Sequence, residues 1–187
     1  MPINLLTIHM QKNTVNEFMY VEETNRLMRG DGILLVTESK SGKPNAMTIG
    51  WGLLGTMWRR PMFTVAVRLS RYTHKLMEES DSFTVCLPTP EMNDWADFCG
   101  NNSGRDVDKF KELGMTASKG SSVKAPYIAE SPVHYECEII YRDPMNAGQL
   151  KKEVESEVYP NMDLHVLYYG EVKGVYATND AKSILRI

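Results

Sequence analysis

The sequence predicts a mainly β fold with helices, in which short and mostly antiparallel strands form a closed or partly open barrel with helices at its periphery. Three observations lead to this prediction. Six β-rich runs recur along the chain, helical segments lie between them, and no repeat or low-complexity linker interrupts the pattern. A length of 187 residues, with 42% hydrophobic and 24% charged side chains, fits one globular domain over residues 1–187.

Four strands are predicted in the first half of the chain. The apolar run over 33–37 indicates a buried strand, and the turn at 41–44 leads into a second strand over 45–51, which makes a hairpin. A β-rich run over 82–87 is the fourth strand. The third, over 62–69, alternates between two faces, one of which is formed by Phe63, Val65, Val67 and Leu69.

Two further strands and five helices complete the expected order. The strands lie over 133–141 and 164–172, and Val175 and Tyr176 continue the second one. Thr73 is expected to cap the N-terminus of the helix that contains it. The helices are predicted over residues 20–29, 72–80, 91–98, 106–113 and 149–158.

The charge distribution points to an anion site. Residues 39–77 contain seven Lys and Arg side chains and no Asp or Glu, whereas the rest of the chain has 14 cations against 24 acids. A basic window in a protein of net charge −3 favours a local anion site over a general polyanion-binding surface. The few basic residues and the lack of an RNP-like or helix-turn-helix pattern argue against a nucleic-acid partner.

The segment that follows Arg68 in this window suits a phosphate. Ser70-Arg71-Tyr72-Thr73 lies directly before a predicted helix, where unpaired backbone N–H groups favour an anion. The hydroxyls of Ser70 and Thr73 and the guanidinium of Arg71 add donors of suitable geometry. The same segment also fits a capped helix with solvated arginines.

Flat apolar side chains lie close to this segment in the sequence. Trp51, Met57 and Trp58 offer surfaces that suit a planar ring carrying a phosphate tail. Burial in the core or in an interface is an equally simple explanation for at least one of the two tryptophans.

The sequence suggests neither export nor a membrane span nor a metal site. The first twelve residues lack a basic segment followed by a long apolar stretch, and no apolar run reaches the ~18 residues that a span needs. Cys86, Cys99 and Cys137 lack metal-type spacing and are odd in number, so free thiols in a reducing cytoplasm are expected. Cys99 is expected to be the most exposed of the three.

Several segments, in order along the chain, resemble the flavin reductase-like, flavoredoxin-type flavoproteins. The resemblance spans residues 30–176 and implies an FMN-binding split β-barrel that is usually a homodimer. The segments that carry it are Asn45-Ala46-Met47-Thr48-Ile49-Gly50-Trp51, Trp58 with Pro61, Val67-Arg68, Arg71-Tyr72-Thr73, Phe98-Cys99-Gly100, Ser103-Gly104-Arg105-Asp106-Val107-Asp108-Lys109, Asp163-Leu164-His165 and Tyr169-Gly170-Glu171-Val172.

The resemblance also implies roles for individual residues. His165 would lie over the flavin ring, where a nicotinamide or another acceptor approaches. The ring itself would be lined by Asn45, Ala46, Met47 and Thr48. The phosphate would be held or flanked by Arg68, Ser70, Arg71, Tyr72 and Thr73. A loop and a helix near the flavin would contribute Cys99, Ser103 and Lys109.

The function implied by the resemblance is that of an NAD(P)H-dependent flavin reductase or a flavoredoxin-like electron-transfer protein. FMN would be the cofactor and NADH or NADPH the electron donor. The alternative is an FMN-holding carrier that has no NAD(P)H activity and needs a redox protein partner. A phosphate-cofactor oxidase of the pyridoxamine type is a weaker alternative.

Two features depart from the family pattern. Leu164 separates Asp163 from His165, where the family has an adjacent Asp-His pair, and residues 149–159 form an insertion found in some members only. From the residues alone, His165 also fits an ordinary barrel position, because it shares a strand face with Leu167 and Tyr169.

Overall fold

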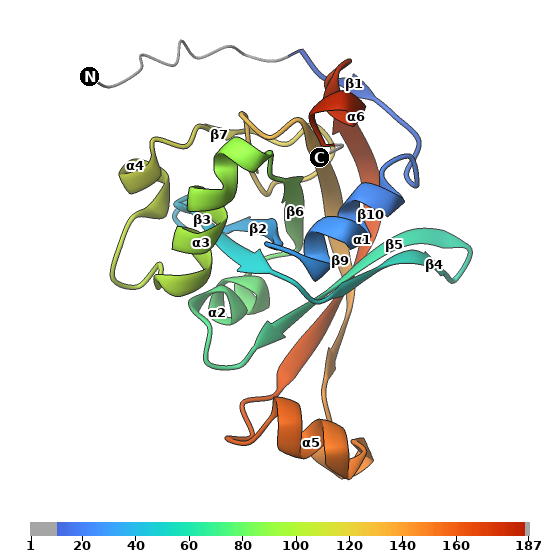
Figure 1. Cartoon of the computed structure of the whole chain (residues 1–187), viewed down its shortest axis with the longest axis vertical. Helices are drawn as coiled ribbons and strands as arrows, with labels where there is room; N and C mark the ends of the chain where they lie inside the picture. The colour runs from blue at the N-terminus through green and yellow to red at the C-terminus, as the bar shows by residue number, and fades with distance from the viewer. Residues whose placement is uncertain (1–10, 186–187) are drawn as a thin grey trace.

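The computed structural model describes residues 11–185, and its main feature is an eight-stranded antiparallel sheet (Figure 1). Short β1 (Asn13–Thr14) pairs with β10, and β7 (Ala117–Ser118) and β8 (Tyr127–Ile128) form a separate small sheet. The other strands follow in the order β3 (Pro44–Ile49), β2 (Ile33–Glu38), β6 (Ser82–Leu87), β9 (Val133–Pro144), β10 (His165–Ala177), β5 (Arg60–Arg68) and β4 (Gly52–Met57).

The sheet curls into a barrel that stays partly open. Its edge strands β3 and β4 are consecutive in the chain, yet within residues 11–185 they do not pair with each other. The link between them approaches β5, where the Ala66 N–H donates to the Trp51 carbonyl at 3.2 Å. The predicted mainly β fold with a closed or partly open barrel is therefore confirmed.

The helices lie around the barrel, with α2, α3 and α4 together on one side and α5 on an arm that projects from β9 and β10 (Figure 1). The longest helices described, α1 and α3, have nine residues, too few to cross a membrane. The helices are α1 (Val21–Arg29), α2 (Tyr72–Glu79), α3 (Asn93–Asn101), α4 (Lys109–Leu113), α5 (Lys152–Val158) and α6 (Ala181–Ile184), with 3₁₀ turns at Pro90–Met92 and Ala147–Gln149.

Two apolar layers explain the unbroken apolar run of β2. Ile33 and Leu35 face the barrel interior, whereas Leu34 and Val36 face a second cluster under α3 and α4. All four side chains are fully buried. A strand covered on both faces reads as a continuous apolar run, which is the pattern that predicted it.

The β4–β5 hairpin was not predicted. Its two turn residues, Trp58 and Arg59, have φ of 53° and 61°, so both adopt the left-handed backbone that a two-residue turn between strands requires. Asn and Gly usually signal such a turn, and neither occurs here. The predicted strand over 45–51 therefore ends earlier, at Ile49, and β4 follows it.

Some side chains at strand ends differ from the predicted pattern. Leu69 was predicted to share a strand face with Phe63, Val65 and Val67, but β5 ends at Arg68, and Leu69 lies beyond the strand and is 49% exposed. The helix predicted over 106–113 is shorter, because the Asp108 carboxylate caps it by accepting from the Lys111 N–H at 3.3 Å.

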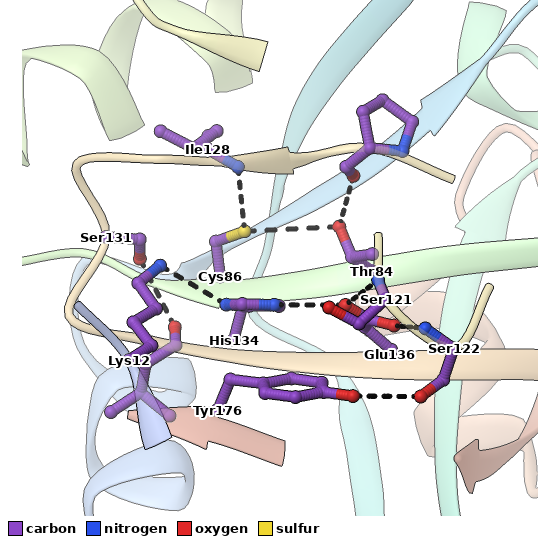
Figure 2. Close-up of polar contacts among 12 residues, drawn as sticks. Lys12, Thr84, Cys86, Ser121, Ser122, Ile128, Ser131, His134, Glu136 and Tyr176 are labelled. Atoms are coloured by element: carbon purple, nitrogen blue, oxygen red, sulfur yellow. Dashed lines mark hydrogen bonds and ion pairs between the residues drawn. The ribbon is translucent and has the colours of Figure 1, made fainter. Parts of the chain in front are cut away.

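A buried polar network lies outside the barrel core, between β9, β10 and the 121–128 loop (Figure 2). Lys12 Nζ lies 3.2 Å from His134 Nδ1, and His134 Nε2 lies 3.2 Å from Glu136 Oε1. The Glu136 carboxylate also accepts from the backbone N–H groups of Ser121 and Ser122, at 2.9 and 2.5 Å. Since an ammonium can only donate, His134 Nδ1 is an acceptor and its Nε2 carries the proton given to Glu136.

This network makes the folded state sensitive to acid. Burial, only partly offset by Glu136, lowers the pKa of His134 to about 4 from its ordinary 6.5. Burial would raise the pKa of Glu136, but the hydrogen bonds from His134, Ser121 and Ser122 outweigh it, and the pKa is lowered. A histidine whose pKa is lower in the folded state stabilises the protein above pH 6.5, and this contribution is lost as the pH falls toward 4.

We therefore expect the free energy of unfolding to fall between pH 6.5 and 4.5, with His134 contributing at most about 1.4 kcal/mol per pH unit. His134→Gln should make this decline shallower without abolishing it, because other buried groups titrate as well. Urea unfolding at a series of pH values measures the slope. A variant as steep as the wild type would contradict the role of His134.

Candidate functional site

Two adjoining pockets lie where β3, the end of β5, α2 and α3 meet. They share Met47 and Arg71, so they form one continuous depression. The first, here called the cationic pocket, has a volume of about 130 Å³ and is lined by Met47, Ser70, Arg71, Tyr72, Thr73, Cys99, Asn102, Ser103, Gly104, Arg105 and Lys109. The second, here called the aromatic pocket, has a volume of about 140 Å³ and is lined by Met47, Thr48, Ile49, Gly50, Trp51, Ala66, Arg68, Arg71 and His165.

The cationic pocket gathers three positive side chains and no acid among the described residues that line it. Arg71 contacts the Gly100 carbonyl at 3.5 Å, and Arg105 donates to the Ser70 carbonyl at 3.2 Å. Within residues 11–185, neither these two arginines nor Lys109 forms an ion pair with a carboxylate. The pocket therefore has a positive charge that nothing in the described chain neutralises.

Lys109 is the buried member of this group. Its Nζ donates to the Ala46 and Cys99 carbonyls, both at 2.8 Å, which ties β3 to the end of α3. Burial lowers the pKa of Lys109, and the nearby charge of Arg71 lowers it further. An ammonium has three donors, so one remains for a group in the pocket that Lys109 lines.

Thr73 lines the cationic pocket and does not cap α2. The prediction that it caps this helix was therefore wrong. The Asn45 side chain donates to Thr73 Oγ1 at 3.0 Å, and both residues are buried. Asn45 lies behind the wall and lines neither pocket. Gly104 packs so closely against Asn45 and Tyr72 that a Cβ at this position would clash with the Asn45 amide.

The aromatic pocket is built around the contact between Trp51 and His165, whose ring centroids lie 4.7 Å apart. The Arg68 guanidinium lies over the Trp51 ring at 5.6 Å. Thr48 and Ala66 line the same pocket, and the Thr48 hydroxyl donates to the Ala96 carbonyl. The result is an open, largely flat depression with 45% of Trp51 exposed.

The strand pairing of β10 with β5 places His165 opposite Arg68. His165 Nδ1 lies 2.9 Å from the Tyr159 hydroxyl, whereas Nε2 has no hydrogen-bond partner within residues 11–185 and is the ring nitrogen left for a ligand of the pocket that His165 lines. Burial, followed by the charge of Arg68, lowers the pKa of His165 to about 4. At neutral pH the imidazole is therefore uncharged.

Two residues predicted to hold a phosphate have other partners. Arg68 lines the aromatic pocket and donates to the Asp163 carbonyl at 2.7 Å and the Val158 carbonyl at 3.4 Å. Ser70 lines the cationic pocket, but its N–H and hydroxyl both donate to the Asp163 carboxylate, at 3.1 and 2.6 Å. The carboxylate of Asp163 thus holds the backbone turn that precedes α2.

Met57 and Trp58 lie away from both pockets. They are at the tip of the β4–β5 hairpin, where Trp58 packs against Tyr141 and Tyr169 at 6.2 and 6.4 Å between ring centroids. Their closeness to Trp51 in the sequence is lost because the hairpin carries them outward.

Cys99 lines the cationic pocket and, as expected, is the most exposed of the three cysteines, but at 1% exposure it is buried as the other two are. Burial, partly offset by Lys109, raises the pKa of its thiol to about 11. The thiol is therefore protonated at neutral pH and is no nucleophile.

Sequence reasoning assigned no role to Arg105, Asn102 or Tyr159. Arg105 lies inside one of the resembling segments, two residues after Ser103, so its charge was the available signal. Tyr159 belongs to the insertion between β9 and β10, and nothing in its local sequence indicates a contact with His165.

Comparison with solved structures supports this architecture. Flavoredoxin of Desulfovibrio vulgaris is 26% identical, with a TM-score of 0.65 over 80% of this chain and 70% of that chain. An FMN-binding domain of a flavin reductase-like enzyme from Shewanella baltica is 19% identical, with a TM-score of 0.65 over 92% of this chain and 80% of that chain. The second likeness shows the fold alone, and the predicted split barrel is confirmed.

Comparison of sequences identifies the family. An uncharacterized protein of Archaeoglobus fulgidus is 32% identical over 130 residues, which are 70% of this chain and 63% of the relative. The chain spans less than two thirds of the length of that relative and 49% of a second one, from Aeropyrum pernix. A family model described as "Flavin reductase like domain" matches residues 28–185. The chain therefore belongs to the flavin reductase-like family, whose solved neighbours include flavoredoxin.

Proposed function

We propose that this protein is an FMN-binding oxidoreductase, in which NADH or NADPH reduces the flavin for transfer to a further acceptor. The observation that carries the proposal is the pair of adjoining pockets, one cationic and one aromatic, joined at Met47 and Arg71. A planar ring with a phosphate tail has the same two-part chemistry. When bound, FMN would supply the electron exchange.

The donor set of the cationic pocket fits a phosphate. Arg71 and Arg105 offer guanidinium donors, Ser103 a hydroxyl, and Lys109 one ammonium hydrogen. A phosphate would neutralise charges that have no carboxylate partner in the described chain. Arg71 is the central residue of this assignment, because it lines both pockets.

The aromatic pocket fits the ring. Met47, Thr48 and Trp51 would border the isoalloxazine, and His165 would face a nicotinamide or another acceptor that approaches it. Because His165 is neutral at pH 7, it would act there as a hydrogen-bonding and packing residue and not as a cation.

Arg71→Ala should weaken FMN binding by roughly 10- to 150-fold, because a hydrogen bond to a charged group contributes about 1.5–3 kcal/mol. Titration of the apoprotein with FMN, followed by flavin fluorescence, measures the affinity. Arg59→Ala, which removes a cation at the tip of the β4–β5 hairpin, is the matched control and should bind as the wild type does. Equal affinity in both variants would refute the phosphate assignment.

The likeness to flavoredoxin favours a second candidate, an FMN-holding electron carrier that has no NAD(P)H activity and receives electrons from a protein partner. Anaerobic spectra of the FMN-loaded protein distinguish the two. For the reductase, NADH or NADPH should bleach the flavin band without added protein. A band that persists with both nucleotides, but is bleached by dithionite, would favour the carrier.

We also propose that the protein forms a homodimer through the outer face of the β4–β5 hairpin. Apolar side chains of the hairpin are strongly exposed, Leu53 by 72% and Trp58 by 58%, and Tyr141 of β9, which packs against Trp58, is 47% exposed. A bulky tryptophan with φ of 53° is a costly conformation, which a second copy packed against it would help to explain. A contiguous exposed apolar patch is typical of a protein–protein interface.

Light scattering after size-exclusion chromatography should give twice the 21.3 kDa of the chain. Trp58→Ser should shift the protein toward the monomer, whereas Met162→Ser, which removes a side chain 48% exposed on the arm, should not. A monomeric wild type would refute the proposed interface.

The three cysteines support the proposal of a reducing, cytoplasmic environment. Cys86, Cys99 and Cys137 are all buried and unpaired. Oxidising compartments favour paired cysteines, so this arrangement fits a protein that keeps its thiols reduced.

A further inference from the structure

The arm between β9 and β10 buries one side chain in the body of the protein. From Met145 to Leu164, Tyr159 is the single buried residue, at 3% exposure, and the preceding helix α5 buries none of its side chains. The Tyr159 ring lies edge-on to Trp51 and His165, at 6.4 and 5.6 Å between ring centroids. An otherwise solvated segment thus packs one aromatic side chain against Trp51 and His165, which line the aromatic pocket.

Side chains of the site hold the arm in this position. Arg68 donates to the Val158 and Asp163 carbonyls and lies over the Tyr159 ring at 5.3 Å. Asp163 in turn accepts two hydrogen bonds from Ser70. The backbone on both sides of Tyr159 is therefore fastened to the end of β5, which fixes the tyrosine relative to His165.

The hydroxyl of Tyr159 has one proton and two neighbours. His165 Nδ1 lies at 2.9 Å and Met145 Sδ at 3.2 Å. An imidazole nitrogen accepts a hydrogen bond far better than a thioether sulfur does. The tyrosine proton therefore goes to Nδ1, and the single proton of the neutral imidazole lies on Nε2.

We propose that Tyr159 is a positioning residue that fixes the His165 ring in the Nε2–H form, so that the aromatic pocket presents a neutral hydrogen-bond donor. This inference rests on the proposed function only for the identity of the ligand that approaches His165. A ring that enters the pocket over His165 should then carry an acceptor oxygen, such as the carbonyl of a carboxamide. Without Tyr159, either nitrogen could carry the proton, and the preference for Nε2 would be lost.

The tautomer can be read in the unliganded protein by long-range ¹H–¹⁵N NMR of the imidazoles, with His165→Gln to assign the signals. In the wild type, Nδ1 should have the shift of an unprotonated nitrogen and Nε2 that of a protonated one. Tyr159→Phe keeps the ring but removes the hydroxyl, and both shifts should move toward intermediate values. Met145→Leu should leave them unchanged.

A wild type with its proton on Nδ1 would overturn the proposal, as would a Tyr159→Phe spectrum equal to that of the wild type. A shift in Met145→Leu would show that the sulfur, not the imidazole, receives the tyrosine proton. Tyr127→Phe, which removes a hydroxyl from a tyrosine in β8, is the matched control. Melting curves confirm that each variant is folded.

Kinetics of the FMN-loaded protein add a second readout. Loss of one hydrogen bond to the incoming nucleotide should raise its KM about 2- to 10-fold in Tyr159→Phe, with a smaller change in kcat. FMN affinity should stay at the wild-type value, because Tyr159 lines neither pocket. If the wild type binds no FMN, the proposed function fails, while the tautomer of the unliganded protein still decides the role of Tyr159.

Discussion

The antiparallel pairing of β5 with β10 runs from Met62 opposite Glu171 to Arg68 opposite His165, and both the barrel and the site depend on it. It joins the β4–β5 hairpin to the rest of the sheet, because β10 is the strand through which β5 and β4 connect to β9 and β6. Its last residue pair brings together a guanidinium and an imidazole from segments almost a hundred residues apart. Both the aromatic pocket and the attachment of the arm start from that pair.

A second constraint is electrostatic. Lys109 is buried and held by two carbonyls, which satisfy hydrogen bonds without neutralising its charge. Arg71 and Arg105 add charge at the same place, so the pocket concentrates an unfavourable interaction that an anion would relieve. Local features that oppose stability in this way commonly mark a functional site.

The arm illustrates how an insertion can contribute to an existing site. Its helix is polar and solvated, and its attachment consists of Tyr159 and a few backbone carbonyls that face Arg68. Arg68 therefore joins the arm to the end of β5 and does not line the cationic pocket. Asp163, separated from His165 by one residue, accepts a hydrogen bond from the Ser70 hydroxyl.

The sequence by itself determined six of the strands, the burial of the strand that begins at Ile33 and the cationic segment around Arg71, because periodicity and charge are local properties of the chain. Most of the residues expected near a ligand, among them Thr48, Trp51 and Lys109, do line the two pockets. Only the tertiary structure decided which ones meet. In the tertiary structure Arg68 lies over Trp51, and Cys99 is buried. Met57 and Trp58 lie at the tip of a hairpin that has no sequence signal for its turn, and Tyr159 contacts His165. Each of these outcomes depends on strand register and on contacts between distant segments, which no local pattern encodes.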